Sequence, residues 1–175
     1  MAHPTSLLVK RLNLLRTPEG EYVCQAVIWG TPQQGPSLAL RLQSALSDYF
    51  DGLPADLVGF PLDLDGFSDF RKQVMRVVQA IAPGQTLTYG QVAKAAGRPG
   101  AARVVGQAMA RNPYPLLVPC HRVVPARGGL GNYGCGGPEV KARLLELERT
   151  GKPLTVSLDL AIEGPGWGCV DGEHH

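Results

Sequence analysis

The sequence predicts a two-domain protein of the α/β class (α+β), in which a small β-sheet with one helix precedes a helical domain. Strand-like segments lie near the N-terminus, apolar stripes at helical spacing dominate residues 67–151, and a turn-rich stretch at residues 51–66 separates the two patterns. We therefore expect domains at residues 1–65 and 66–152, followed by a tail at residues 153–175.

Two strands and a helix are expected in the first domain. Residues 6–15 and 21–30 are rich in β-branched, aromatic and other apolar residues, which predicts strands. The stretch RTPEGE between them contains Pro18 and Gly20 and predicts the turn of a hairpin or small meander. Residues 36–50 combine a proline–serine start with leucines at roughly helical spacing, which predicts a helix.

Helices are expected throughout the second domain. Residues 67–81 place an apolar stripe behind a Ser68 cap, and residues 138–151 begin at a proline. Residues 88–97 and 101–112 predict two short helices joined by a Gly/Pro turn, which is a helix-turn-helix pattern.

Two further segments are not helical. Residues 112–119 contain three prolines in eight residues, which excludes a helix and predicts a rigid extended link leading to Cys120. Residues 155–162, in the tail, alternate apolar and polar side chains, which predicts one strand.

Composition restricts the class of protein. The 175 residues allow one domain or two small ones, and an apolar content of 44% is enough for a buried core. No run of roughly 18 apolar residues occurs, so no membrane span and no membrane partner are expected. The N-terminus lacks a secretion-signal pattern, so we expect a cytoplasmic or nucleoid location.

The charged residues are distributed unevenly. Residues 1–69 contain four Lys or Arg and eight Asp or Glu, and residues 139–175 contain four basic and seven acidic residues. Residues 70–138 contain nine Lys or Arg and no Asp or Glu. This acid-free segment favours a polyanion-binding face, with phosphate contacts that weaken as salt rises, over a solvated surface that arose by chance.

The cysteines form no metal-binding motif. They lack CxxC spacing and no histidine cluster accompanies them, which argues against a zinc ribbon. Without a secretion signal, free thiols are expected rather than disulfides. The first domain holds only Cys24 and His3 as cysteine and histidine, so we expect neither a metal site nor a cofactor. The four cysteines are Cys24, Cys120, Cys135 and Cys169.

The stretch VPCHRVV places Cys120 beside His121, the only histidine away from the chain ends. A thiol with a pKa of ~8.5 is little ionised at neutral pH, and a nearby base raises the ionised fraction. Adjacent residues of an extended strand point to opposite sides, so a water-bridged contact is as plausible as a direct one. The orienting carboxylate must come from outside the acid-free segment; the candidates are Glu139, Glu146 and Glu148. A buried structural thiol beside a core histidine remains the alternative.

NPYPLLVPCHRVV (residues 112–124) closely resembles the active-site signature of the O6-alkylguanine-DNA alkyltransferases, whose core is Pro-Cys-His-Arg-Val. LSDYFDG and FPLDLDGFSDFRKQV resemble the interdomain stretch of that family, and TLTYGQVAKAAGRPGAARVVGQAMARN resembles its helix-turn-helix. GNYGCGG and VKARLLELE resemble its closing loop and helix, so the resemblance covers approximately residues 45–150. It implies a ribonuclease-H-like N-terminal sheet before a helical DNA-binding and catalytic domain.

The resemblance implies direct repair of O6-alkylguanine in double-stranded DNA. The alkyl group would pass irreversibly to Cys120 in a single-turnover methyltransferase that acts as a monomer. His121 would act as a base through a water molecule, and Glu148 would hold its imidazole. Asn112 would brace the turn before Cys120, and Tyr89 would donate a proton or hydrogen bond to guanine N3.

The resemblance also implies the contacts of the flipped base. The backbone near Tyr133 and Gly134 would bind the O6 atom, and Tyr133 and Pro115 would form walls of the alkyl pocket. Carbonyls of Cys120 and Val123 would bind the guanine amine.

The target nucleotide must leave the duplex before it can reach a buried thiol. The resemblance implies that Arg103 fills the vacated space, while small residues let the helix approach the DNA backbone in the minor groove. The expected DNA-binding residues are Arg98, Ala101, Ala102, Arg103, Gly106 and Arg111.

The sequence departs from the family pattern at several positions. Met75 stands where tryptophan is usual, and Val104 stands where alanine is common. The loop GNYGCGGPEV carries one extra residue, and Gly134 stands where serine is common, which puts the range and rate of alkyl transfer in doubt. Cys135 is a second thiol close to the expected pocket, and we expect it to be a bystander.

Three other functions compete with alkyl transfer. An alkyltransferase-like protein would bind the lesion without repairing it, but such relatives usually lack the cysteine. A cysteine hydrolase using Cys120 and His121 would turn over an ester or amide, and would not explain the acid-free segment. A transcriptional role for the helix-turn-helix would call for a second, regulatory domain, and none is visible in the sequence.

Overall fold

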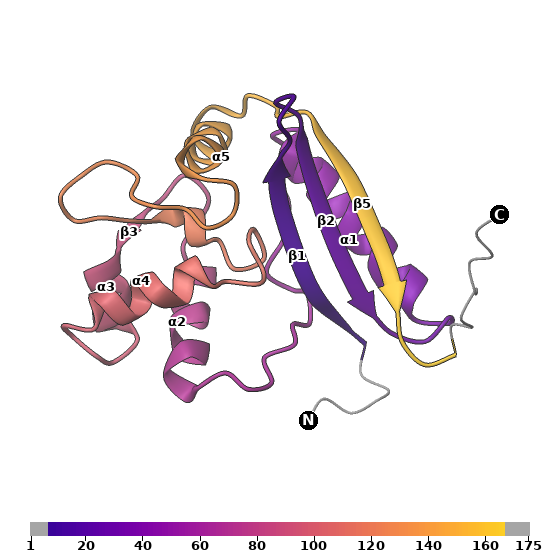
Figure 1. Cartoon of the computed structure of the whole chain (residues 1–175), viewed down its shortest axis with the longest axis horizontal. Helices are drawn as coiled ribbons and strands as arrows, with labels where there is room; N and C mark the ends of the chain where they lie inside the picture. Colours follow the sequence, from indigo (N-terminus) through magenta and orange to yellow (C-terminus); the bar gives the residue numbers. More distant parts are fainter. Residues whose placement is uncertain (1–6, 167–175) are drawn as a thin grey trace.

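The computed structural model describes residues 7–166, and Figure 1 shows a sheet on one side of the molecule and a group of helices on the other. The elements run in the order β1 (Leu8–Arg16), β2 (Tyr22–Trp29), α1 (Gly35–Phe50), α2 (Asp69–Gln79), β3 (Leu87–Thr88), α3 (Tyr89–Ala95), α4 (Ala102–Ala110), a 3-10 helix (Cys120–Arg122), β4 (Val123–Val124), α5 (Pro138–Thr150) and β5 (Val156–Glu163). Within these residues, no helix is long and apolar enough to cross a membrane.

The larger sheet has the strand order β1-β2-β5. β1 and β2 form the expected antiparallel hairpin, whereas β5 runs parallel to β2 and places Leu158 opposite Cys24. Residues 156–163 of the expected tail therefore belong to the same sheet as the hairpin. Residues 167–175, including Cys169, lie outside the described part of the chain. The domain boundary expected near residue 65 stays a prediction.

α1 covers one face of this sheet, as Figure 1 shows. Its buried side chains Leu38, Leu42 and Leu46 recur at helical spacing, so that they all point toward the strands. Leu12 of β1 and Ile28 of β2 are fully buried on the sheet side of the same core.

The helices form where the sequence predicts them, with ends within two residues of the expected ones. The expected spans of two of them included the caps. The Ser68 side chain accepts a hydrogen bond from the Arg71 amide, and Thr88 forms a capping box with Gln91. α3 and α4 pack against each other as the expected helix-turn-helix, and α5 ends at Gly151 in the left-handed conformation.

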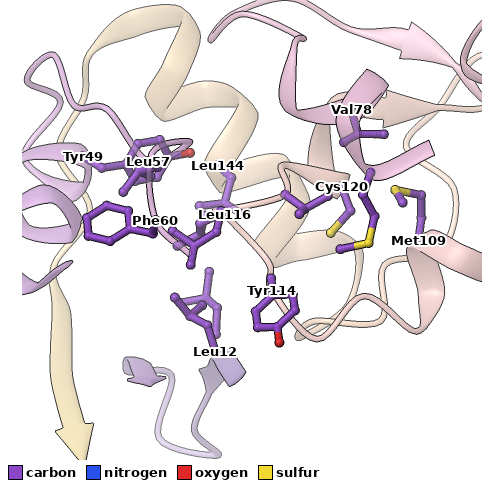
Figure 2. Packing of buried hydrophobic residues seen from close by; sticks show 14 of the residues in the cluster. Leu12, Tyr49, Leu57, Phe60, Val78, Met109, Tyr114, Leu116, Cys120 and Leu144 are labelled. Carbon is purple, nitrogen blue, oxygen red and sulfur yellow. The ribbon is translucent and has the colours of Figure 1, made fainter. Parts of the chain in front are cut away.

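One continuous apolar core joins the sheet to the helices. Figure 2 shows Leu12 of β1 and Tyr49 of α1 near Leu116, with Leu144 of α5 and Cys120 in the same cluster. The Cys120 side chain is therefore placed in the interior of the molecule, where both halves of the chain determine its position.

Candidate active site around Cys120

The segment before Cys120 is a closed turn. The Asn112 side chain donates to the Val118 carbonyl (2.8 Å) and accepts from the Tyr114 amide (3.0 Å), while Leu116 has a positive φ of 74°. The expectation of an extended link was wrong. The prolines exclude a helix, but a single amide side chain that both donates and accepts folds the segment back on itself. Asn112 lies where a brace of this turn was expected.

The same turn is fixed to the first half of the chain. The Leu12 amide of β1 donates to the Pro113 carbonyl (2.9 Å), and the fully buried Tyr114 hydroxyl bonds to the carbonyls of Lys10 (3.1 Å) and Asp63 (2.7 Å). The position of Cys120 is therefore supported by strand β1 as well as by the local turn.

Cys120 and His121 lie on a turn of 3-10 helix and not on an extended strand. Their residues are 2% and 0% exposed, respectively. No hydrogen bond among the described residues joins the thiol to the imidazole directly. The His121 Nε2 atom instead lies 2.5 Å from the Glu148 Oε1 atom of α5.

Glu148 is the centre of a buried polar network. Its carboxylate accepts from Arg122 through Nε (3.0 and 3.1 Å) and Nη2 (2.8 Å), from the Tyr49 hydroxyl (2.7 Å) and from the Gly84 amide (3.2 Å). Burial alone would raise the pKa of Glu148, but the hydrogen bonds from His121 and Arg122 outweigh it and lower that pKa. The carboxylate is therefore ionised.

The other two candidate carboxylates lie elsewhere. Glu139 pairs with Arg16 on the surface, and Glu146 pairs with Arg143. The alternative in which Glu148 pairs on a solvated helix face was wrong, because its side chain is only 1% exposed.

The His121 ring is prepared to accept a proton. Burial lowers its pKa more than the Glu148 carboxylate raises it, so the ring is neutral near pH 7. With Nε2 directed at a carboxylate, the single ring proton belongs on that nitrogen. The Nδ1 atom is buried and has no hydrogen-bond partner among the described residues, which leaves its lone pair available.

The Cys120 thiol is acidified although it is buried. Its pKa is lowered from 9.0 to about 7, first by a side-chain hydrogen bond with Cys135, against the opposing effect of burial. Asn112, Tyr133 and the charge of Lys141 lower it further. Cys120 is thus substantially ionised at neutral pH, which distinguishes it from the buried Cys24, whose pKa burial raises to about 12.

Lys141 is a site residue that sequence reasoning missed. It is fully buried on α5, donates to the Val123 carbonyl (2.6 Å), and lies 5.9 and 6.0 Å from the ring centres of Tyr89 and Tyr133. Its position on the apolar face of α5, one turn before Leu144, was the available signal. Arg122 and Tyr49 were missed in the same way, since their roles come from contacts between distant elements.

Tyr89 and Tyr133 both border Cys120. β3 pairs in parallel with β4, which brings the start of α3 and Tyr89 next to the strand that follows the 3-10 helix. Burial and the charge of Cys120 raise the pKa of Tyr89, so its hydroxyl stays protonated. Burial likewise raises the pKa of Tyr133, whose hydroxyl is enclosed without an oxygen or nitrogen partner among the described residues.

The remaining expected substrate contacts are at different degrees of readiness. The Val123 carbonyl already accepts from Lys141, and the Cys120 carbonyl from the Val123 amide, so each offers a guanine amine only its second lone pair. Pro115 is buried in the Asn112 turn, and Gly134 is exposed in the loop before α5.

The expected DNA-binding residues lie on and around α4. Arg103 is exposed near the start of that helix, and Arg111 is exposed at its end. The Arg98 guanidinium lies 4.5 Å over the Phe70 ring, a contact that positions it beside α2. Gly106 lies against the Tyr89 ring, 3.9 Å from the place where a Cβ would be. The half-buried Ala101 and Ala102 begin α4.

The described residues contain no group of three or more His, Cys, Asp or Glu side chains that could hold a metal ion. His3, named with Cys24 in the expectation about metals, lies outside the described part. The cysteines within residues 7–166, which are Cys24, Cys120 and Cys135, are free thiols.

Comparison with known proteins identifies the family. Residues 69–150 match the family described as 6-O-methylguanine DNA methyltransferase, DNA binding domain. The chain is 45% identical over 114 residues to a methylated-DNA–protein-cysteine methyltransferase of Mycolicibacterium paratuberculosis, over 65% of this chain and 67% of the relative. It is 40% identical over 148 residues to the Mycobacterium tuberculosis protein of that name, over 84% and 86% of the two chains.

Its fold is also similar to a solved structure, that of Mycobacterium tuberculosis OGT in complex with DNA. The TM-score is 0.63 at 33% sequence identity, and the match covers 83% of this chain and 96% of that chain. The sequence match and the fold match both extend across the sheet half and the helical half of the molecule. The chain belongs to the methylated-DNA–protein-cysteine methyltransferase family.

Proposed function

We propose that this protein repairs O6-alkylguanine in double-stranded DNA by irreversible transfer of the alkyl group to Cys120. The observation that carries this proposal is the combination of a buried, acidified thiol with a neutral histidine whose Nδ1 atom is unpartnered. A structural thiol in an apolar core has its pKa raised by burial, as Cys24 does. Membership of the family supplies the class of substrate.

The chemical step is a displacement at the alkyl carbon. The Cys120 sulfur forms a bond to that carbon while the carbon–O6 bond breaks, and the electron pair of that bond leaves with guanine. His121 takes the thiol proton through a water molecule, and the ionised Glu148 stabilises the resulting imidazolium. The protonated Tyr89 hydroxyl donates to guanine N3, where negative charge develops.

The product explains the stoichiometry. A thioether sulfur is a very poor leaving group in water, so the alkyl group stays on Cys120 and each molecule acts once. The nucleophile belongs to the protein and the leaving group to the substrate, so the balanced reaction needs no cofactor.

Access to Cys120 requires base flipping. With 2% of the residue exposed, Cys120 cannot meet a base that is stacked in a duplex. Arg103, exposed near the start of α4, is suited to fill the space that the flipped nucleotide leaves. Pro115 and Tyr133 form walls of the pocket that receives the base. The small residues of α4 allow the helix to approach the DNA closely.

The proposed substrate fits a monomer that acts in the cytoplasm, in contact with the nucleoid. The division into an N-terminal domain at residues 1–65 and a catalytic domain at residues 66–152 is part of this proposal. The exposed arginines of the acid-free segment supply the charge that a DNA surface attracts.

The deciding experiment is intact-protein mass spectrometry after incubation with an oligonucleotide that holds one O6-methylguanine, beside the Cys120→Ser variant. We expect one methyl group per molecule of the native protein and none on the variant. Absence of a mass gain despite tight and selective binding of the lesion would instead identify a lesion-binding protein of the alkyltransferase-like class.

A further inference from the structure

The loop that carries Cys135 has little freedom to move away from the active site. The Gly137 amide closes it by donating to the Tyr133 carbonyl (3.0 Å). A Cβ at Gly134 would lie 2.6 Å from the carbonyl oxygen at the end of α4, and one at Gly136 would lie 2.7 Å from a side chain of α5. Both neighbours of Cys135 must therefore be glycine for the loop to pack between the two helices as it does.

Within this loop Cys135 turns toward the interior. It is half-buried, packs against the apolar core, and its side chain is hydrogen-bonded to that of Cys120. The Tyr133 hydroxyl interacts with both sulfurs. Two thiols and one phenol thus form a cluster at the point where the alkyl group must arrive.

The proton between the two sulfurs belongs to Cys135. Its pKa is raised well above the ordinary thiol value, first by the hydrogen bond with Cys120, whereas the pKa of Cys120 is lowered to about 7. Near neutral pH the pair therefore holds one thiolate, on Cys120, and one S–H group, on Cys135.

We infer that Cys135 donates its S–H hydrogen to the Cys120 sulfur and holds that sulfur ready to attack, so that it is a catalytic residue and not the bystander expected from the sequence. Its place in repair rests on the proposed function, but the ionisation of Cys120 can be measured without DNA. The same arrangement explains how a pocket with two thiols gives one product. A protonated thiol is a weak nucleophile, so Cys135 escapes alkylation while it activates its neighbour.

The test is the pH dependence of carbamidomethylation of Cys120 by iodoacetamide, with the modified peptides resolved by mass spectrometry. It compares the native protein with Cys135→Ala and Cys135→Ser, which differ by one hydroxyl donor. At a pH one unit below the native midpoint, we expect Cys120 in Cys135→Ala to react about tenfold more slowly, as for a pKa rise of about one unit. Cys135→Ser should recover most of the native rate, because its hydroxyl also donates.

A control variant, Cys24→Ala, removes a thiol from the sheet core and should leave the Cys120 profile unchanged. An unchanged profile in Cys135→Ala would overturn the inference, and a serine variant that behaves like the alanine variant would assign the effect to packing alone and overturn it as well. If the profile shifts as expected but no methyl group is ever transferred from DNA, the inference stands and the proposed function fails.

Discussion

Tyr49 of α1 donates a 2.7 Å hydrogen bond to Glu148 of α5, and its hydroxyl lies 3.5 Å from the His121 Nε2 atom. The helix that covers the N-terminal sheet thus reaches the carboxylate that orients the proposed base. The first half of the chain is therefore part of the active site and not only a support for it.

Replacement of this hydroxyl should slow repair. In Tyr49→Phe, Glu148 loses one donor while the ring still packs, so we expect unfolding free energy to fall by about 2 kcal/mol. Single-turnover transfer from an O6-methylguanine duplex should slow several-fold, with unchanged DNA affinity. Urea unfolding and quenched-flow assays measure the two effects. Tyr22→Phe, on the sheet, is the matched control and should change neither; equal behaviour of the two variants would exclude a role for Tyr49.

The rate of alkyl transfer should follow the ionisation of Cys120. Because the pKa of that thiol is lowered to about 7, the thiolate fraction and the transfer rate should rise about tenfold between pH 6 and pH 8 and then level off. His121 is neutral throughout this range, since its pKa is lowered, and so it does not produce the rise. Single-turnover rates across this range check the midpoint, and a flat profile would contradict it. Duplex binding by Cys120→Ser should stay constant and serves as the control.

Glu148 should make the protein sensitive to acid. Its pKa is lowered in the folded state, so its contribution to stability is complete well above the unfolded value of about 4.5 and is lost as pH falls below it. Glu148→Gln leaves Arg122 with a buried, uncompensated charge and should cost about 3–5 kcal/mol at pH 7. The variant should also lose less stability than the native protein between pH 5 and pH 3, in urea unfolding at each pH.

Glu146→Gln is the matched control, because Glu146 pairs with Arg143 at the surface of the same helix. Its cost should be within about 1 kcal/mol at any pH. If the two glutamine variants lost equal stability, the buried network around Glu148 would not be a main source of stability.

Gly134 should not tolerate a side chain. A Cβ there would lie 2.6 Å from the Ala110 carbonyl oxygen, which is backbone and cannot rotate away, so Gly134→Ser should displace the loop. We expect reduced thermal stability and slower transfer to Cys120. Gly90→Ala, where the nearest atom would be 4.0 Å away in α3, should be neutral or slightly stabilising. Calorimetry of both variants tests the contrast, and a fully active serine variant would show that the loop can repack.

Arg103 should matter only when the base must be flipped. Arg103→Ala should weaken repair of a duplex far more than the reaction with free O6-alkylguanine base, because the free base needs no substitute in a stack. Parallel rate measurements on the two substrates give the ratio. Arg149→Ala, an exposed arginine on α5, is the control of equal charge. Equal losses on both substrates would remove Arg103 from the flipping role.

Local patterns were enough to predict the helices and the strands. The Ser68 and Thr88 caps and the apolar stripes are written within single segments, and these elements form within two residues of their predicted ends. The pairing of β5 with β2 has no local signal, because the register of two distant strands is decided by packing in the folded chain.

The same distinction applies to the site. Cys120, His121 and Glu148 were found from a motif and from the need for a carboxylate, and the structure brings the latter two together. Lys141 was missed because a lysine is rarely buried unpaired, so its place on an apolar helix face was not given weight. The contact between Cys135 and Cys120 depends on how a glycine-flanked loop folds back, which spacing along the chain does not encode.

The third strand of the sheet has a consequence for how the molecule is made. β5 comes after α5 in the chain, so the hairpin formed by the first residues to leave the ribosome waits for its partner until the whole helical half has been synthesised. Pairing across so long a stretch is slow to nucleate. A cell that spends one molecule on each lesion must therefore replace its repair capacity through a late folding step, and damage that arrives faster than new sheets close would accumulate.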